Sequence, residues 1–204
     1  MKNFKLKQAK SYLGQSDKIM QRMIKETASV TFKENNHSYF HALVSTIINQ
    51  QLSVKAAATI EKRVLEKQGG RGFTANKLHG LDSEPLRQCG LSRNKIRYIK
   101  TLAEAVVNKK LNFRKLALLD NESIRNHLIS YPGIGQWSAD IFLMTGLGRE
   151  DIFPVGDLII RKSMQHFYAL PSDSHYDKYI AIAENWRPYR TVASFYLWKS
   201  FHQL

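Results

Sequence analysis

Apolar residues recur through most of this chain at the spacing of a single helix face. Alternation of apolar and polar residues, which marks a β-strand, never continues beyond a few positions. The clearest apolar stripe has members at i, i+3, i+4, i+7 and i+8, which share one side of an α-helix. It consists of Phe40, Leu43, Val44, Ile47 and Ile48. The sequence therefore predicts an all-α protein.

Residues that favour helix starts divide the chain into segments. Ser53, Ser92 and Asp120 or Asn121 are the expected N-caps. The solvent face of the helix begun by Ser92 is predicted to carry Arg93, Lys95, Arg97 and Lys100. The expected helices cover residues 40–48, 54–67, 73–78, 83–88, 92–106, 121–128, 136–145 and 158–167, with two more between 174 and the C-terminus.

The chain is strongly basic, with a net charge of +14 and a pI of about 9.9. The excess is concentrated between Lys55 and Lys115, where 15 basic residues stand against 5 acidic ones. Any single Lys or Arg is most often a solvated surface residue, but the sum favours a polyanion as partner. We therefore expect binding to nucleic acid.

Several classes of protein are excluded by what the sequence lacks. No stretch approaches the roughly 18 to 20 apolar residues of a membrane-spanning helix, and the first ten residues lack the apolar core of a signal peptide. We expect an intracellular protein without membrane contact, in the cytoplasm of a bacterium or the nucleus of a eukaryote. The single cysteine, Cys89, cannot form an internal disulfide or supply the four thiolates of an iron–sulfur cluster.

The most informative segment joins two predicted helices through a Pro-Gly-Ile-Gly turn that contains Gly133 and Gly135. Two glycines two residues apart let the backbone turn sharply and approach another surface closely. The first turn of the following helix, which includes Ser138, presents backbone amides at the positive end of the helix dipole. Such amides bind phosphate without reading base sequence, so we predict DNA-backbone contacts from Gly133, Gly135 and Ser138. An ordinary helical hairpin is the alternative.

Five segments of the sequence are informative when they are taken together and in order. They are residues 47–53 with Ala56-Ala57, Gly90-Leu91-Ser92 with Lys95 and Ile99, the Pro-Gly-Ile-Gly hairpin, Phe153-Pro154-Val155-Gly156-Asp157, and residues 186–190 with Trp198. Together they resemble the helix-hairpin-helix DNA glycosylase superfamily, and within it the DNA-3-methyladenine glycosylase II family. The resemblance implies two helical subdomains with the hairpin beside an active-site cleft between them. Residues 33–147 would form one subdomain, and residues 1–32 with 148–204 the other.

Asp157 matches the catalytic aspartate of the resembled family. Breaking an N-glycosidic bond develops positive charge on the deoxyribose, and a nearby carboxylate stabilises that charge and orients water. The residue precedes an apolar helical run, where the amides of a helix start favour an anion. The same position suits a plain N-cap, which is the commoner role of an Asp before a helix.

Two tryptophans match positions of the base pocket in the resembled family. Trp137 stands where members that also cut the DNA strand carry a nucleophilic lysine, two residues after the second glycine. Schiff-base chemistry is unavailable at that position, so we expect the reaction to stop at an abasic site. Trp198 matches a second pocket aromatic, and an indole face attracts a cationic alkylated purine by about 0.5–2 kcal/mol. Core packing is the alternative for both.

A base must leave the duplex to reach a buried carboxylate, so another residue must fill the gap. We predict Gln51 as this wedge because it lies at the end of the 40–48 helix, with Leu52 as the alternative. The resemblance alone implies a monovalent cation on hairpin carbonyls. Its candidate ligands are Ser130, Tyr131 and Ile134. No organic cofactor and no iron–sulfur cluster are expected, and none of the seven histidines belongs to a zinc motif.

The sequence thus predicts a monofunctional DNA glycosylase of base excision repair, a monomeric hydrolase acting on damaged double-stranded DNA. It would remove alkylated purines, 3-methyladenine above all and also 7-methylguanine. A glycosylase for a different lesion or mismatch fits the Trp137 and Asp157 pair equally well. A noncatalytic helix-hairpin-helix DNA-binding protein is the third interpretation, although plain phosphate binding has no use for a negative charge at Asp157.

Overall fold

The computed structural model describes residues 5–27, 30 and 37–203, and every regular element in these ranges is a helix. The all-α prediction is confirmed. The chain divides into two compact units, which we call the terminal unit (Met1–Glu34 with Gly148–Leu204) and the central unit (Asn35–Leu147). The boundary predicted at residues 32–33 lies outside the described residues. Within the described ranges, no helix has the length and apolar character needed to cross a bilayer.

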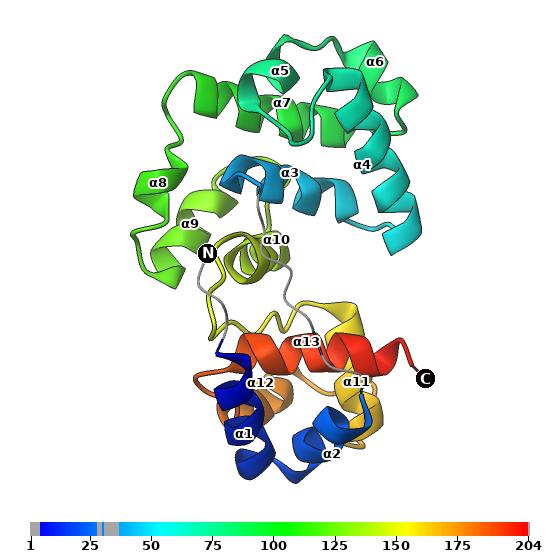
Figure 1. Cartoon of the computed structure of the whole chain (residues 1–204), viewed down its shortest axis with the longest axis vertical. Coiled ribbons are helices and arrows are strands. Elements are labelled where there is room, and N and C mark those ends of the chain that lie inside the picture. The colour runs from blue at the N-terminus through cyan, green and yellow to red at the C-terminus, as the bar shows by residue number, and fades with distance from the viewer. Residues whose placement is uncertain (1–4, 28–29, 31–36, 204) are drawn as a thin grey trace. The chain divides into compact units, whose positions relative to one another are not determined.

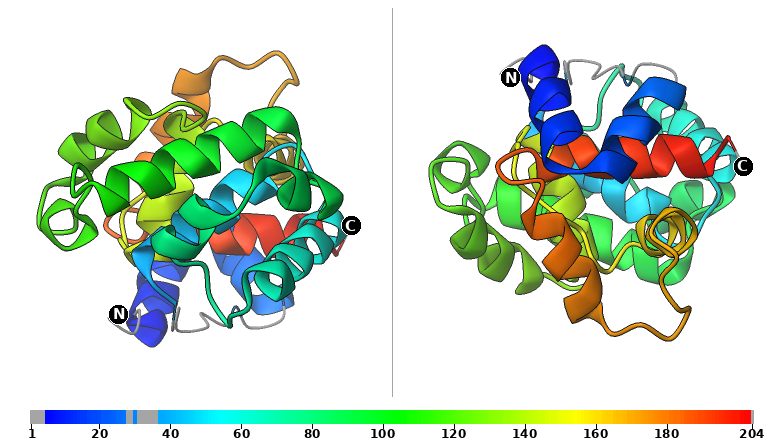
Figure 2. Two further views of the ribbon diagram at one scale, coloured as in Figure 1. Left: turned by 90° about the horizontal axis from the view of Figure 1, so that it is seen from above. Right: turned by 90° about the horizontal axis from the view of Figure 1, so that it is seen from below.

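The terminal unit is built from both ends of the chain. Its helices are α1 (Leu6–Ser16), α2 (Lys18–Glu26), α11 (Leu158–Phe167), α12 (Tyr176–Glu184) and α13 (Arg190–Phe201). Helices α1 and α2 lie against α13, as the blue and red ribbons show (Figures 1 and 2). The core combines residues far apart in sequence, such as Leu13, Met20, Met164 and Leu197.

Asp17 ties the two ends of the chain together inside this unit. Its Oδ1 caps α2 by accepting the amides of Ile19 and Met20, at 2.8 and 3.0 Å. Its Oδ2 accepts the Tyr168 hydroxyl at 2.7 Å and the Trp186 indole N–H at 2.9 Å. Both oxygens of one carboxylate are therefore satisfied by groups from the two chain ends, which fixes α1 and α2 onto the C-terminal helices.

The central unit holds the rest of the helices. They are α3 (Tyr39–Asn49), α4 (Val54–Gln68), α5 (Ala75–Gly80), α6 (Ser83–Gln88), α7 (Arg93–Val107), α8 (Phe113–Leu116), α9 (Asn121–Ile129), α10 (Gln136–Ile141) and the π-helix η1 (Phe142–Gly146). Helix α3 contacts α4, α7, α10 and η1, and its predicted apolar stripe is buried. Helices α5 and α6 pack on α7 (Figure 1).

The predicted caps are present. The hydroxyls of Ser53 and Ser92 each accept the amide three residues on, at 3.3 Å in both cases, and Asp120 rather than Asn121 caps α9. The single helix predicted over residues 136–145 is wrong in one respect, because α10 becomes a π-helix at Phe142. The Leu147 amide donates to the Phe142 carbonyl five residues back, a widened turn that periodicity does not predict.

His41 is buried in α3, and both ring nitrogens have neighbours. Nδ1 accepts the Phe73 amide at 3.0 Å, so the ring proton sits on Nε2, which lies 3.4 Å from a Glu61 carboxylate oxygen. The ring also stacks on Phe73 and packs against His37. Burial, and secondarily the neighbouring His37, lowers the pKa of His41 to about 4.

Acid should destabilise the protein through this histidine. His41 takes up a proton near pH 6.5 in the unfolded chain and near pH 4 in the folded chain. Folding stability is therefore lost as the pH falls between these values. The contribution amounts to about 3 kcal/mol at the acid end. In His41→Asn, the amide oxygen still accepts the Phe73 amide, so urea unfolding should show a flatter pH dependence than wild type. An identical dependence in the two proteins would refute the assignment.

Candidate functional site

The two glycines of the predicted hairpin have different surroundings. Gly133 has a φ of +81°, and a Cβ there would collide with the ring of Tyr98 on α7. Gly135 has a φ of −102°, which any residue adopts, and a Cβ there would meet no atom within 4 Å. Gly133 therefore permits close packing of the turn on α7, whereas Gly135 is exposed at the start of α10.

The first turn of α10 presents backbone amides next to this exposed glycine. The first intrahelical bond runs from the Ala139 amide to the Gly135 carbonyl at 3.0 Å, so the amides of Gln136 and Ser138 precede it. Gln136 is exposed, as an anion site requires. The side chain of Ser138 is buried, so a DNA contact from this residue would have to use its backbone amide.

Gln50 fastens the hairpin to the C-terminal end of α3. Its Nε2 donates to the Gly133 carbonyl at 2.7 Å and to the Ser138 hydroxyl at 2.8 Å. Sequence reasoning assigned no role to this residue, because the two bonds cross 83 and 88 positions of the chain. The available signals were its place beside Gln51 at a helix end and within the 47–53 segment of the family resemblance.

Lys95 does not lie on the solvent face of α7 as predicted. Its Nζ donates to the carbonyls of Ile48 and Gln50, at 2.8 and 2.7 Å. Carbonyls at a helix C-terminus have no intrahelical donor and attract an ammonium group, which explains the inward position. Partial burial lowers the pKa of Lys95.

The predicted wedge residues lie in the turn between α3 and α4. Gln51 is exposed and has a φ of +56°, a left-handed conformation that costs a non-glycine residue about 1 kcal/mol. Leu52 is 39% exposed. Gln51 directly follows Gln50, whose carbonyl accepts from Lys95 and whose side chain donates to the hairpin. The turn is thus held in a conformation that presents Gln51 and Leu52 to solvent, as a wedge requires, and such strain is typical of functional sites.

The predicted cation ligands lie at the C-terminal end of α9 and in the hairpin. The Tyr131 carbonyl accepts the Ile134 amide at 3.2 Å, and its second lone pair remains available for a cation. Neutral carbonyl oxygens on one turn fit a hard monovalent cation in their chemistry. Among the described residues, no group of three or more His, Cys, Asp or Glu side chains could hold a metal ion.

Asp157 and Trp198 are brought together in the terminal unit. Asp157 is the N-cap of α11 and is 8% exposed. Its Oδ1 accepts the Ile160 amide at 3.0 Å and the Trp198 indole N–H at 3.0 Å. Upstream, the Asp157 amide donates to the Pro154 carbonyl at 2.8 Å. Both the backbone and the carboxylate of this residue are held in place.

The two tryptophans of the predicted base pocket belong to different units. Trp198 on α13 is half-buried, packs edge-on against Phe195 and contacts the core of the terminal unit. Its bond to Asp157 gives the indole N–H a function that the sequence did not predict. Trp137 is half-buried at the start of α10 in the central unit. For both rings, contact with a flipped base stays a prediction.

Residues 44–188 match the model of a protein family described as HhH-GPD superfamily base excision DNA repair proteins. The chain belongs to this superfamily. It is 32% identical to DNA-3-methyladenine glycosylase 1 of Schizosaccharomyces pombe over 163 residues, which cover 79% of this chain and 72% of that protein.

Two solved structures are similar over nearly the whole chain. The S. pombe 3-methyladenine DNA glycosylase Mag1 in complex with abasic DNA superposes with a TM-score of 0.85 at 29% identity, covering 94% of this chain and 95% of that one. A DNA-3-methyladenine glycosidase from Bacillus halodurans gives a TM-score of 0.78 at 34% identity, covering 94% and 88%. The HhH-GPD segment contains Gln50, Lys95, the hairpin and Asp157, whereas Trp198 lies beyond it.

The two hairpin glycines should respond differently to substitution by Ala. Gly133→Ala places a Cβ against Tyr98 and keeps a left-handed φ, which should lower stability by about 2–4 kcal/mol. Gly135→Ala meets open space and should lower stability by less than about 1 kcal/mol, while weakening DNA binding through the exposed amides. Thermal melting and binding to undamaged and methylated duplexes test both. Weaker binding confined to one base sequence would contradict contact through phosphate.

Proposed function

We propose that this protein is a monofunctional DNA glycosylase of base excision repair, which hydrolyses the N-glycosidic bond of alkylated purines and leaves an abasic site. The observation that carries the proposal is the buried Asp157, whose carboxylate is oriented by two N–H donors. The similarity to relatives named DNA-3-methyladenine glycosylase supports 3-methyladenine as the first substrate, and 7-methylguanine is proposed as a second cationic purine of the same kind. A glycosylase for another lesion would use the same carboxylate.

The central unit binds the DNA backbone and holds the duplex open. Phosphate is bound by the amides of Gln136 and Ser138 beside the exposed Gly135, a contact that ignores base sequence. A monovalent cation on the carbonyls of Ser130, Tyr131 and Ile134 would add positive charge at the same turn. No other metal or organic cofactor enters the proposal. Gln51 or Leu52 enters the gap that the extruded nucleotide leaves in the base stack.

Asp157 acts on the extruded nucleotide. As the bond from sugar to base breaks, positive charge develops on the deoxyribose, and the carboxylate stabilises it and orients the attacking water. The bond from Trp198 holds Oδ1 in position, so this tryptophan acts as a positioning residue in addition to its predicted contact with the base. A cationic base over the Trp137 or Trp198 ring gains about 0.5–2 kcal/mol.

The reaction stops at the abasic site because the position of the lyase lysine is occupied by Trp137, which offers no amine to the sugar. The enzyme acts as a monomer on double-stranded DNA, since one chain contains the hairpin, the wedge turn and the carboxylate.

Removing the charge at Asp157 should abolish base release without unfolding the protein. Asp157→Asn keeps an oxygen that can cap α11 and accept the Trp198 N–H, but it loses the negative charge. We expect release of 3-methyladenine from randomly methylated DNA to fall by about 100-fold or more, with DNA binding unchanged or tighter. Chromatography of the released bases under single-turnover conditions gives both the rate and the lesion range.

Asp120→Asn is the matched control, because Asp120 also caps a helix through its side chain. It should keep wild-type excision. If Asp157→Asn keeps more than about a tenth of the rate, another carboxylate such as Asp140 or Asp151 must act instead. Release of only unmethylated or mismatched bases by wild type would assign a different lesion.

The wild-type product should be intact DNA with an abasic site. The strand is expected to break only after alkali or heat, and borohydride should trap no covalent complex, because Trp137 offers no nucleophilic amine. Denaturing gels run with and without alkali measure this. Prompt cleavage together with a trapped complex would show that another residue supplies a lyase amine.

A further inference from the structure

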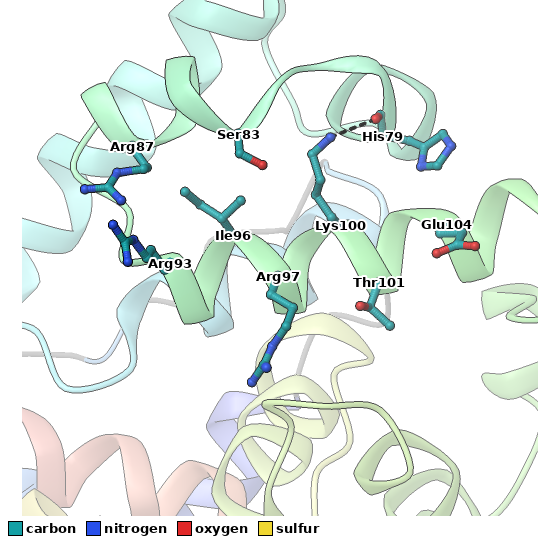
Figure 3. A pocket seen from close by; sticks show the side chains of 9 residues that line it. All are labelled: His79, Ser83, Arg87, Arg93, Ile96, Arg97, Lys100, Thr101 and Glu104. Carbon is teal, nitrogen blue, oxygen red and sulfur yellow. Dashed lines mark hydrogen bonds between the residues drawn. The ribbon is translucent and has the colours of Figure 1, made fainter.

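A basic cavity of about 560 Å³ in the central unit is lined by residues of α5, α6 and α7 (Figure 3). Its lining includes four permanent cations and a single carboxylate. These are Arg87, Arg93, Arg97, Lys100 and Glu104, together with His79. None of these side chains has a role in the proposed reaction.

The cations of the cavity are poorly neutralised by the protein. Arg87 faces Glu84 at 4.0 Å, and the Glu84 side chain is 71% exposed, so this pair is weak. Among the described residues, no ion pair involves Arg93 or Arg97. Figure 3 shows Arg87 and Arg93 reaching the same end of the cavity from α6 and α7. Two like charges that converge without a carboxylate between them favour an added anion.

Arg93 also occupies a position where a cation is unfavourable for its own helix. It is the first residue of α7, whose first turn contains no acidic side chain. A cation there opposes the positive end of the helix dipole, where an acidic residue would be stabilising. A bound anion beside Arg93 would offset this unfavourable position.

Helix α7 contributes both to the cavity lining and to the packing of the hairpin. The Arg97 guanidinium lies 5.4 Å from the centre of the Tyr98 ring, the same ring on which Gly133 packs. Arg97 points away from Lys100, to the opposite side of α7 (Figure 3). Arg93 and Lys100 stand seven residues apart, which is about 10 Å along an α-helix. Phosphates of one strand advance about 3.4 Å each along a duplex, so this length matches a short run of backbone.

We infer that this basic cavity is a second DNA-backbone site, which binds phosphates other than those held by the hairpin. The inference rests on the proposed function for the kind of partner. A phosphate backbone suits the lining better than an acidic protein does, because the apolar residue in the cavity, Ile96, is only 4% exposed. Of the side chains that the structure describes, no Trp, Tyr, Phe or Met, the other types enriched at protein interfaces, lines the cavity, whereas its four cations to one carboxylate suit a polyanionic backbone.

The test is the salt dependence of binding to an undamaged duplex of about 25 base pairs. Arg87→Gln with Arg93→Gln removes two cavity charges. The slope of log K against log salt should become shallower by about 2, and affinity at low salt should fall about 10- to 100-fold. Lys62→Gln with Lys110→Gln is the matched control, because it removes two exposed charges of the same unit that lie outside the cavity. The salt slope of this control should stay closer to the wild-type slope than the slope of the cavity variant does.

Undamaged DNA separates this inference from the proposed function, because no base excision is measured. A wild-type protein without glycosylase activity would refute the proposed function and leave the salt result standing. Equal slopes for the cavity variant and the control, with both proteins folded by thermal melting, would overturn the inference. An acidic protein partner would then be the occupant to seek.

Discussion

One carboxylate oxygen organises the candidate active site. Oδ1 of Asp157 accepts the Ile160 amide at the start of α11 and the Trp198 indole N–H from α13. Because Asp157 is buried, these two bonds position a charge that water would otherwise surround. The segment before it is held as well, since Arg161 donates to the Val155 carbonyl at 2.9 Å. A cap that stabilises α11 thereby also positions the group proposed to act on the sugar.

In the central unit, the C-terminal end of α3 likewise combines a structural role with a proposed functional one. Lys95 donates to the carbonyls at the C-terminal end of this helix. The side chain of Gln50, at the same helix end, donates to the hairpin. Gln51 follows immediately with a left-handed backbone. The turn predicted to carry the wedge and the hairpin predicted to bind phosphate are thus linked by direct hydrogen bonds within one unit. In the proposed enzyme this link couples binding of the backbone to opening of the duplex, since neither turn can shift without breaking bonds to the other.

The sequence predicted what depends on near neighbours and missed what depends on distant ones. Helix periodicity and the caps at Ser53, Ser92 and Asp120 involve residues within a few positions, and the structure has them. The bond from Trp198 to Asp157 spans 41 positions, and that from Lys95 to Gln50 spans 45. No local pattern distinguishes Lys95 from the solvent-facing cations beside it. The difference in packing between Gly133 and Gly135 could not be predicted either, because it depends on the Tyr98 ring.

The role of the Trp198 N–H is tested most directly by Trp198→Phe, which keeps an aromatic ring and removes the donor to Asp157. Single-turnover excision should be measured on cationic 3-methyladenine and on a neutral lesion such as hypoxanthine, with thermal melting to show that the fold survives. If the N–H positions the carboxylate, both rates should fall by a similar factor of about 10. A wild-type rate on both lesions in a folded variant would contradict a carboxylate that depends on Trp198.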